Sequence, residues 1–489
     1  MPAQALTRWQ GLDVTVEEDG SLQVALAETG EVVLDDVAVG FDGGWQRART
    51  EVLVDEVEQH WLLEHEGAVQ ARAVVRHVFD DAWRVRVQLQ NLTDVEIAVP
   101  PCRLDMSAAW PMRRWLAGAE GQISIDAGRE DGQLLTLTQL RGRSRLSEGH
   151  SWLTDLPVRL GPAVTPSAGY QVGWRGDWLR DQRVQAAALP SWWPARTVLA
   201  DAQESVRLDL PDAAIEAAGV SLLEDEQGTH LVARPGIHLV QVHAGRGTTD
   251  VELAWADDLV ADHLAPSVES LVGTDPRVLE PHQAVLLTRA VQHGLDVDPE
   301  HLAQAIETLA TRPGTVHPLA LAAAADLAMT SPDAADHLPE MASRMALQPG
   351  ALTVALHAMT ASRLVGGPAT LQLPSGVPLP VAGLDETVAR AVVEAEVACF
   401  RAGTDSPAGP VPRPVERVMA LLGAGLPGHT VGPQARALLL AVASRLPEQW
   451  EAPRWPVTVP ELRELARHRL LAERCDDVSL AWLLLSLES

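Results

Sequence analysis

The sequence predicts a protein of two parts, an N-terminal antiparallel β-sandwich followed by a C-terminal array of antiparallel helical hairpins. Three observations lead to this prediction. Apolar and polar residues alternate with a period of two in the first half, apolar residues recur at helical spacing after position 256, and twelve of the 15 Trp residues precede that position. A chain of 489 residues is long enough for about two to four domains.

Residues 1–195 are predicted to form the large sandwich. In residues 83–90 every apolar residue is followed by a polar one, which places one face of a strand in a core and the other in water. Segments with similar patterning, separated by turn signals such as Asp131-Gly132, are 22–26, 69–78, 122–125, 134–140 and 170–174.

Residues 196–256 follow a Pro-bounded stretch at 189–194 and contain five short predicted strands. Two interpretations of this segment stay open. It is either a small Ig-like β module or the part that closes the larger sandwich.

Residues 257–489 are predicted to form the helical-hairpin domain. Leu302, Ala305, Ile306 and Leu309 make an apolar stripe along one helix face. Pro fits the first turn of a helix, where its missing N–H has no partner to lose, and it recurs at predicted helix starts. These prolines are Pro281, Pro299, Pro318, Pro332, Pro349, Pro433 and Pro460. The array is either a closed toroid or an open solenoid.

The charge balance excludes one class of partner. The chain carries 66 acidic and 38 basic residues, a net charge of −28, whereas nucleic-acid binding requires cationic surface.

All the basic residues are Arg, and there is one Tyr, Tyr170, and one Asn, Asn91. Depletion of residues with A/T-rich codons indicates a GC-rich genome, such as that of an actinobacterium.

Several kinds of site and compartment are not expected. The 3 Cys residues are far apart and form no CxxC pair, which argues against a disulfide framework or a structural zinc site. No apolar run is long enough to span a membrane, and the N-terminus does not resemble a signal peptide. The glycines at 423–428 match a dinucleotide motif, but Pro427 removes an N–H that phosphate would need. We therefore expect a cytoplasmic protein without cofactor or metal.

The candidate binding residues lie in Trp-rich segments of the β half. Indole faces stack on the apolar faces of sugars, and Arg and Asp side chains hydrogen-bond to ring hydroxyls. The alternative is that Trp fills the sandwich core of a chain poor in Phe and Tyr. The candidates are Trp110, Arg113, Arg114, Trp115, Trp174, Arg175, Asp177, Trp178, Trp192 and Trp193.

The order of these parts resembles that of one group of carbohydrate-active enzymes. These glycoside hydrolases and phosphorylases join a β-supersandwich, of the galactose mutarotase type, to an (α/α) toroid of the six-hairpin glycosidase type. A local similarity is the strand at 83–91, which runs into Asn91-Leu92-Thr93-Asp94. The resemblance implies a carbohydrate ligand, but it assigns no catalytic residue here, and fold analogy alone does not establish function.

Two functions follow as hypotheses. The first is a non-enzymatic binding protein whose β half recognises a carbohydrate or a protein partner. The alternative is a divergent glycoside hydrolase or phosphorylase with its site between the halves. Such an enzyme needs two carboxyl groups about 5–10 Å apart, and the helical half offers Glu280, Asp385, Glu386, Glu394 and Glu396.

Overall fold

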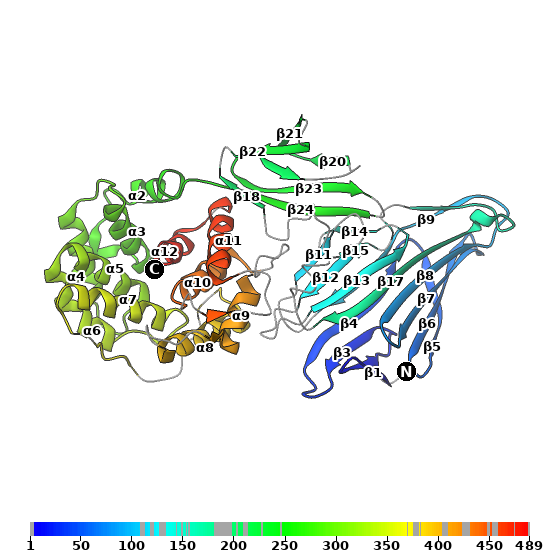
Figure 1. Cartoon of the computed structure of the whole chain (residues 1–489), viewed down its shortest axis with the longest axis horizontal. Helices are drawn as coiled ribbons and strands as arrows, with labels where there is room; N and C mark the ends of the chain where they lie inside the picture. The colour runs from blue at the N-terminus through cyan, green and yellow to red at the C-terminus, as the bar shows by residue number, and fades with distance from the viewer. Residues whose placement is uncertain are drawn as a thin grey trace.

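The structure is a computed structural model of the chain, and it has a strand lobe and a helical lobe (Figure 1). The N-terminus lies in the strand lobe and the C-terminus in the helical lobe. The predicted order of a β region followed by an α region is confirmed. The structure describes residues 4–487 except 108–112, 118–121, 127–133, 143, 148–149, 153, 155–156, 180–197, 202–203, 209–213, 226–227, 245–246, 369, 375–380, 382, 403–408, 423–430, 447–449, 452–457 and 474.

The larger sheet has eleven strands in the order β1-β2-β3-β4-β10-β15-β14-β24-β23-β20, with β18 also paired to β24. Its neighbours are antiparallel except for β14–β24 and β18–β24, which are parallel. The strands are β1 (Gln4–Trp9), β2 (Leu12–Val16), β3 (Leu22–Leu26), β4 (Val32–Phe41), β10 (Cys102–Ser107), β14 (Ser144–Ser147), β15 (His150–Trp152), β18 (Val198–Asp201), β20 (Ala214–Ala217), β23 (Gly236–Ala244) and β24 (Gly247–Ala256).

The second sheet has eight antiparallel strands in the order β11-β12-β13-β17-β8-β7-β6-β5. These are β5 (Trp45–Val52), β6 (Glu56–His65), β7 (Ala68–Phe79), β8 (Trp83–Asn91), β11 (Arg113–Ala117), β12 (Gln122–Asp126), β13 (Leu134–Arg141) and β17 (Gly169–Leu179). Alternate residues of β8 are buried and accessible, as its sequence predicts. One face of this sheet therefore meets the core, and the opposite face is called the outer face below.

The core of the sandwich lies between the two sheets and is rich in indole. Trp9 of β1 packs edge-on against Trp83 of β8, with ring centroids 6.4 Å apart. Trp83 also stacks on Phe79 at 5.5 Å. Trp174 joins the same buried cluster. Large aromatic side chains bury extensive apolar area, so these rings stabilise the contact between the sheets.

The strands after residue 197 continue the larger sheet and add a small one. β24 pairs with β14 through Ser144 opposite Gly247, so the segment extends the first sheet. A three-stranded sheet is made by β19 (Val206–Leu208), β22 (Gly228–Ala233) and β21 (Val220–Asp225). Short pairs are formed by β9 (Ile97–Val99) with β16 (Val158–Leu160), and by β25 (Gly409–Pro410) with β26 (Trp450–Glu451).

The helical lobe consists of short helices with Pro at or near several starts, as predicted. α3, α4, α5 and α10 each begin at a Pro, while Pro332 begins a 3₁₀ turn. The helices are α2 (Ala265–Leu271), α3 (Pro281–Gln292), α4 (Pro299–Thr311), α5 (Pro318–Thr330), α6 (Leu338–Ser343), α7 (Ala351–Leu364), α8 (Glu386–Ala402), α9 (Arg413–Leu422), α10 (Pro433–Ala443), α11 (Val459–Ala472) and α12 (Asp477–Leu485).

α5 lies at the centre of the helical lobe, between α3 and α7. Its residues from Pro318 to Ala328 are all buried, and most are Ala. A helix that is apolar on all sides belongs inside a layer of other helices. Small Ala side chains also let neighbouring helices approach closely, which suits this central position.

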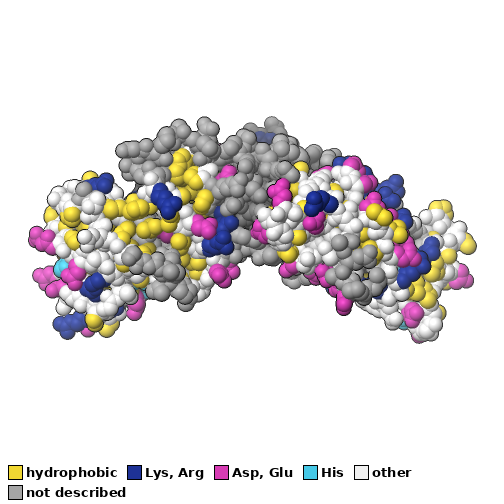
Figure 2. Space-filling model, turned by 90° about the horizontal axis from the view of Figure 1, so that it is seen from below, with side chains coloured by type: hydrophobic (Ala, Val, Ile, Leu, Met, Phe, Trp, Pro, Cys, Tyr) yellow, Lys and Arg dark blue, Asp and Glu magenta, His cyan; other side chains and the backbone are white. Residues whose placement is uncertain are grey.

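The two lobes contact one another where β24 meets α11. The N–H of Asp257, the first residue after β24, donates to the carbonyl of Leu471 in α11 at 3.2 Å. Trp255 in β24 is fully buried. Figure 2 shows the lobes as a bent, elongated body on which basic and acidic side chains are interspersed. Within the described residues, no helix has the length and apolar character needed to cross a bilayer.

Candidate functional site

The predicted Trp-rich segments differ in what the structure describes of them. Trp110, Trp192 and Trp193 lie outside the described residues. Arg113, Arg114 and Trp115 are described as backbone only, in strand β11 at one edge of the eight-stranded sheet. Their role in binding therefore stays a prediction.

The segment from Trp174 to Trp178 is strand β17, in the middle of the same sheet. Its alternation places both indoles on the core side, with Trp174 1% and Trp178 8% exposed. The accessible residues between them are Arg175 and Asp177, whose side chains form an ion pair at 3.2 Å. The polar pair, and not the indoles, is what this segment presents on the outer face.

Backbone register brings two of the predicted segments into one row of the sheet. Trp115 pairs with Ser124, Ser124 with Thr136, and Thr136 with Asp177. Neighbouring strands are about 4.8 Å apart, so the row joins the two segments over about 14 Å. Residues from separate Trp-rich segments thus belong to one sheet, although they are far apart in sequence.

A notch opens on the outer face of the sheet where β13, β17 and β8 lie side by side. Its cavity is about 380 Å³ and is lined by Arg86, Leu140, Arg141, Gln171 and Gly173. Gly173 pairs with Arg141 on one side and with Arg86 on the other. Because Gly173 has no side chain, the row has a gap between two arginines, and this gap forms the floor of the notch.

A β-bulge in β13 is responsible for the position of Arg141. Gln139 pairs with Trp174, but the next pair is Arg141 with Gly173, so Leu140 is the extra residue. Gln139 is buried, whereas both Leu140 and Arg141 are exposed. Strict alternation would place Arg141 on the same face as Gln139. The bulge redirects its side chain to the outer face, a role that bulges often have beside functional sites.

The arginines of the notch differ from most arginines around them in having no acidic partner. Among the described residues, Arg86 has no hydrogen bond or ion pair, and the guanidinium of Arg141 donates only to the side-chain oxygen of Gln171 at 3.0 Å. By contrast, Arg84 forms ion pairs with two aspartates. The notch is therefore a local concentration of unpaired positive charge on a strongly acidic chain.

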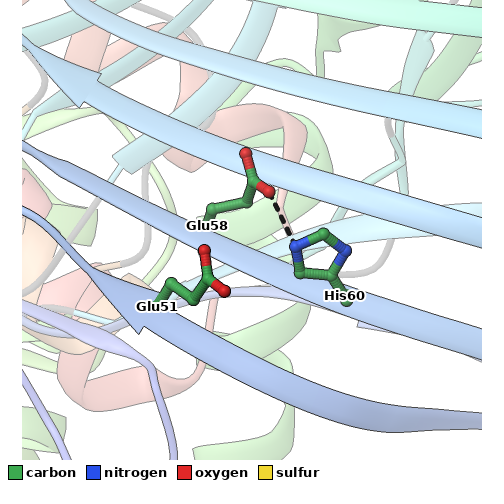
Figure 3. Close-up of side chains that lie close together, drawn as sticks. All are labelled: Glu51, Glu58 and His60. Carbon is green, nitrogen blue, oxygen red and sulfur yellow. Dashed lines mark ion pairs between the residues drawn. The ribbon is translucent and has the colours of Figure 1, made fainter.

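A cluster of Glu51, Glu58 and His60 lies on β5 and β6, farther along the same sheet (Figure 3). Nε2 of His60 is 2.7 Å from a carboxylate oxygen of Glu58. The ligand atoms of all three side chains lie within 4.8 Å of one another, a spacing that can hold a metal ion. Carboxylate and imidazole groups suit zinc and similar divalent metals.

Two arginines already occupy the carboxylates of this cluster. The guanidinium of Arg49 is 3.0 Å from Glu51, and that of Arg76 pairs with both Glu56, at 2.9 Å, and Glu58. A cation bound here would face both guanidiniums or displace them. The cluster therefore fits a network of surface ion pairs better than a metal centre.

The carboxylates considered for glycoside hydrolysis have structural roles in the helical lobe. The side chain of Glu280 is the first member of a capping box at the start of α3. Glu394 pairs with Arg390 at 3.0 Å and with Arg417 at 3.2 Å. Glu386 is exposed at the start of α8. Glu280 therefore stabilises a helix start, whereas Glu394 forms ion pairs in the middle of α8.

Glu396 differs from the other acids because its side chain is buried and because it lies in the interior of α8. Its carboxylate accepts hydrogen bonds from the backbone N–H of Gly350, at 3.0 Å, and of Thr353, at 2.8 Å. It thus caps the first turn of α7 from α8. Burial raises the pKa of Glu396 to about 7, against the opposing effect of the hydrogen bonds from Thr353 and Gly350.

A buried polar network, not predicted from the sequence, links α3, α5 and α7. The carboxylate of Asp326 is fully buried and lies 2.8 Å from the guanidinium of Arg289 and 2.7 Å from Nε2 of His357. His357 in turn lies 3.5 Å from the guanidinium of Arg445. The one sequence signal for this network is Asp326 itself, an acidic residue within a run of Ala and Leu on α5.

Comparisons with known proteins add little beyond the fold. No family model and no curated protein sequence matches the chain. A solved structure described as a polysaccharide lyase is similar with a TM-score of 0.46 and 10% sequence identity. That match covers 91% of this chain and 78% of the other. We draw no functional conclusion from a likeness at this level.

Proposed function

We propose that this chain is a binding protein that recognises a carbohydrate through the outer face of its eight-stranded sheet. The observation that carries the proposal is the notch at Gly173. It is a concave site lined by side chains that donate hydrogen bonds, Arg86, Arg141 and the amide of Gln171. A cavity with a few convergent polar groups suits a ligand with many hydroxyl groups.

The composition of the notch favours a saccharide over a protein partner. Protein interfaces centre on buried aromatic anchors, often together with Arg, whereas the described lining of the notch contains no aromatic side chain. The notch instead combines two arginines and an amide with one apolar side chain, that of Leu140, which is 49% exposed. Leu140 offers an apolar contact for the C–H face of a sugar, and the polar groups suit its hydroxyls.

The predicted binding residues extend this surface along the sheet. Arg175 is the next outward residue of β17 after Gly173, and its partner Asp177 shares a row with Trp115. We propose that a saccharide longer than one unit runs from the notch toward this row. In this proposal Trp115 supplies the stacking platform, as its segment predicts.

A glycoside hydrolase remains the weaker alternative. Three of the acids considered for it, Glu280, Glu394 and Glu396, already have structural partners. A catalytic pair that used any of these three would have to release it from that role. The notch, by comparison, contains Arg86, whose side chain has no partner within the described part of the chain.

The test is a glycan array on the full chain, followed by two matched variants. Gly173→Leu places a side chain in the notch, and its Cβ meets no atom closer than the carbonyl of Val85 at 4.0 Å. Gly169→Leu makes the same change on the same strand and face, outside the notch. We expect wild type and Gly169→Leu to bind the same glycan and Gly173→Leu to lose it. Absence of any glycan binding, or full binding by Gly173→Leu, would contradict the proposal.

A further inference from the structure

We infer that the notch binds an oxyanion carried on the saccharide, so that the ligand is an acidic sugar polymer bearing carboxylate or sulfate groups. The inference rests on the proposed function and adds the chemical class of the ligand. It is carried by the side chains around the notch, where neither Arg86 nor Arg141 has an acidic partner among the described residues.

Within the described part of the chain, no acidic side chain neutralises the two arginines of the notch. Cross-strand pairing gives a row that runs from Arg141 through Gly173, Arg86 and Arg76 to Glu58. Arg76 and Glu58 pair with each other. Arg86 has no such partner among the described residues, and Arg141 contacts only an amide. Two like charges on one small site repel each other unless an anion lies between them.

The acids nearest along the sheet have other cations as partners. Glu56 and Glu58 are paired with Arg76, and Asp177 is paired with Arg175. None of these three acids can neutralise the arginines of the notch unless it first leaves its present arginine partner. The net charge of −28 opposes the approach of a polyanion elsewhere on the chain, so a fixed negative group would be held by the local charge of Arg86 and Arg141.

The hydrogen-bond donors of the notch suit the oxygens of an anionic group. A guanidinium presents a planar fork of N–H donors that matches the oxygens of a carboxylate or sulfate. Because a guanidinium can only donate, the side-chain oxygen of Gln171 faces Arg141 and accepts its hydrogen bond. The NH₂ group of the same Gln171 amide has no hydrogen-bond partner among the described residues. Arg86, Arg141 and this NH₂ thus give the notch donors from three side chains, and its described lining contains no carboxylate.

The experiment compares polygalacturonate with its fully methyl-esterified form, which has the same sugar backbone without the negative charge. Calorimetry on the full chain measures both, together with a sulfated glucan and inorganic sulfate. We expect the two acidic polymers to bind and the ester to bind at least about tenfold more weakly, since a charge-assisted hydrogen bond contributes roughly 1.5–3 kcal/mol. Binding of the acidic polymers should weaken as salt concentration rises.

Three arginine variants locate the effect. Arg86→Gln and Arg141→Gln each remove one unpaired cation, and each should lower affinity for polygalacturonate by about 10- to 100-fold. Arg84→Gln is the matched control, because Arg84 lies on the same strand and face but is neutralised by Asp80 and Asp81. It should leave that affinity within about twofold, since a paired surface charge contributes little. All three positions are accessible, so circular dichroism and melting temperature should stay close to wild type.

The outcomes separate the inference from the proposed function. Equal binding of polygalacturonate and its ester, with both abolished in Gly173→Leu, would overturn the charge inference and leave carbohydrate recognition standing. Binding of inorganic sulfate without binding of any saccharide would overturn both. Loss of affinity in Arg84→Gln equal to that in Arg86→Gln would show a diffuse electrostatic effect and overturn the assignment to the notch.

Discussion

The indole N–H of Trp83 donates a hydrogen bond to Nδ1 of His77 at 3.2 Å, inside the core of the sandwich. Both side chains are 1% exposed, and their rings stack with centroids 5.9 Å apart. Since Nδ1 accepts this bond, the imidazole is neutral and carries its proton on Nε2. Burial lowers the pKa of His77 to about 4 from 6.5.

The first prediction is an acid-dependent loss of stability from His77. Its pKa is about 4 when folded and about 6.5 when unfolded, so the unfolded chain binds more protons between these values. The contribution of His77 to the free energy of unfolding is therefore complete above pH 6.5 and lost as the pH falls toward 4. Urea unfolding of wild type and His77→Gln from pH 4 to 7 should show a flatter profile in the variant. His65→Gln, at a side chain that is 68% exposed, is the control and should follow wild type.

The second prediction has the opposite sign and concerns Glu396. Its pKa rises from 4.5 to about 7 on folding, so the folded chain binds the extra proton between these values. Stability from this group is complete below pH 4.5 and falls as the pH rises to 7, by on the order of 3 kcal/mol in the free energy of unfolding. Glu396→Gln keeps an oxygen to accept from Gly350 and Thr353 but does not titrate. Between pH 4.5 and 7 the free energy of unfolding of wild type should therefore fall relative to that of the variant. A constant difference in the free energy of unfolding over this range would contradict the assignment of the titration to Glu396.

The third prediction concerns the buried ion pair of Asp326 and Arg289. Asp326→Asn preserves the size of the side chain but removes the carboxylate charge that lies 2.8 Å from the guanidinium of Arg289, which is 4% exposed. Breaking a buried pair in this way should lower the free energy of unfolding by about 3–5 kcal/mol. The comparison is Glu464→Gln, which removes an exposed pair with Arg467 and should cost less than about 1 kcal/mol. Similar losses in the two variants would show that the buried network contributes no more than a surface pair.

The fourth prediction tests packing at the start of α7. Gly350 has φ +92°, and a Cβ there would lie 2.3 Å from the ring of Trp482 in α12. Gly314 has a similar φ of +99° but no atom within 4 Å of an added Cβ. Both Ala variants carry backbone strain, so the difference between them isolates the clash. We expect Gly350→Ala to be less stable than Gly314→Ala by about 1–3 kcal/mol in thermal or urea unfolding. Equal stabilities would show that Trp482 moves aside freely.

Much of the local structure was predictable because it depends on neighbours in sequence. The alternation over residues 83–90 predicted β8, since a strand between core and solvent needs a polar residue at every second position. The helix starts at Pro281, Pro299 and Pro318 were predictable because Pro has a fixed φ and no N–H to lose.

The placement of the site depended on contacts that the sequence does not display. The Trp-rich segment at β17 indicated a binding surface, yet Trp174 and Trp178 face the core, because a strand in mid-sheet turns alternate residues toward the facing sheet. Indole is apolar enough to serve on either face, and residue type alone did not decide between them.

The sequence by itself determined the order of the β and α regions and the periodicity of individual strands and helices. It also determined the net charge of −28, which argues against a nucleic-acid partner. The tertiary structure alone decided that Arg86 and Arg141 meet across Gly173. Arg141 reaches the outer face only through the bulge that pairing with β17 imposes. Register between strands is set by turns and by packing of the whole sheet, and a shift of one residue turns every side chain to the other face. That is the physical reason why the notch follows from the fold and not from any local motif.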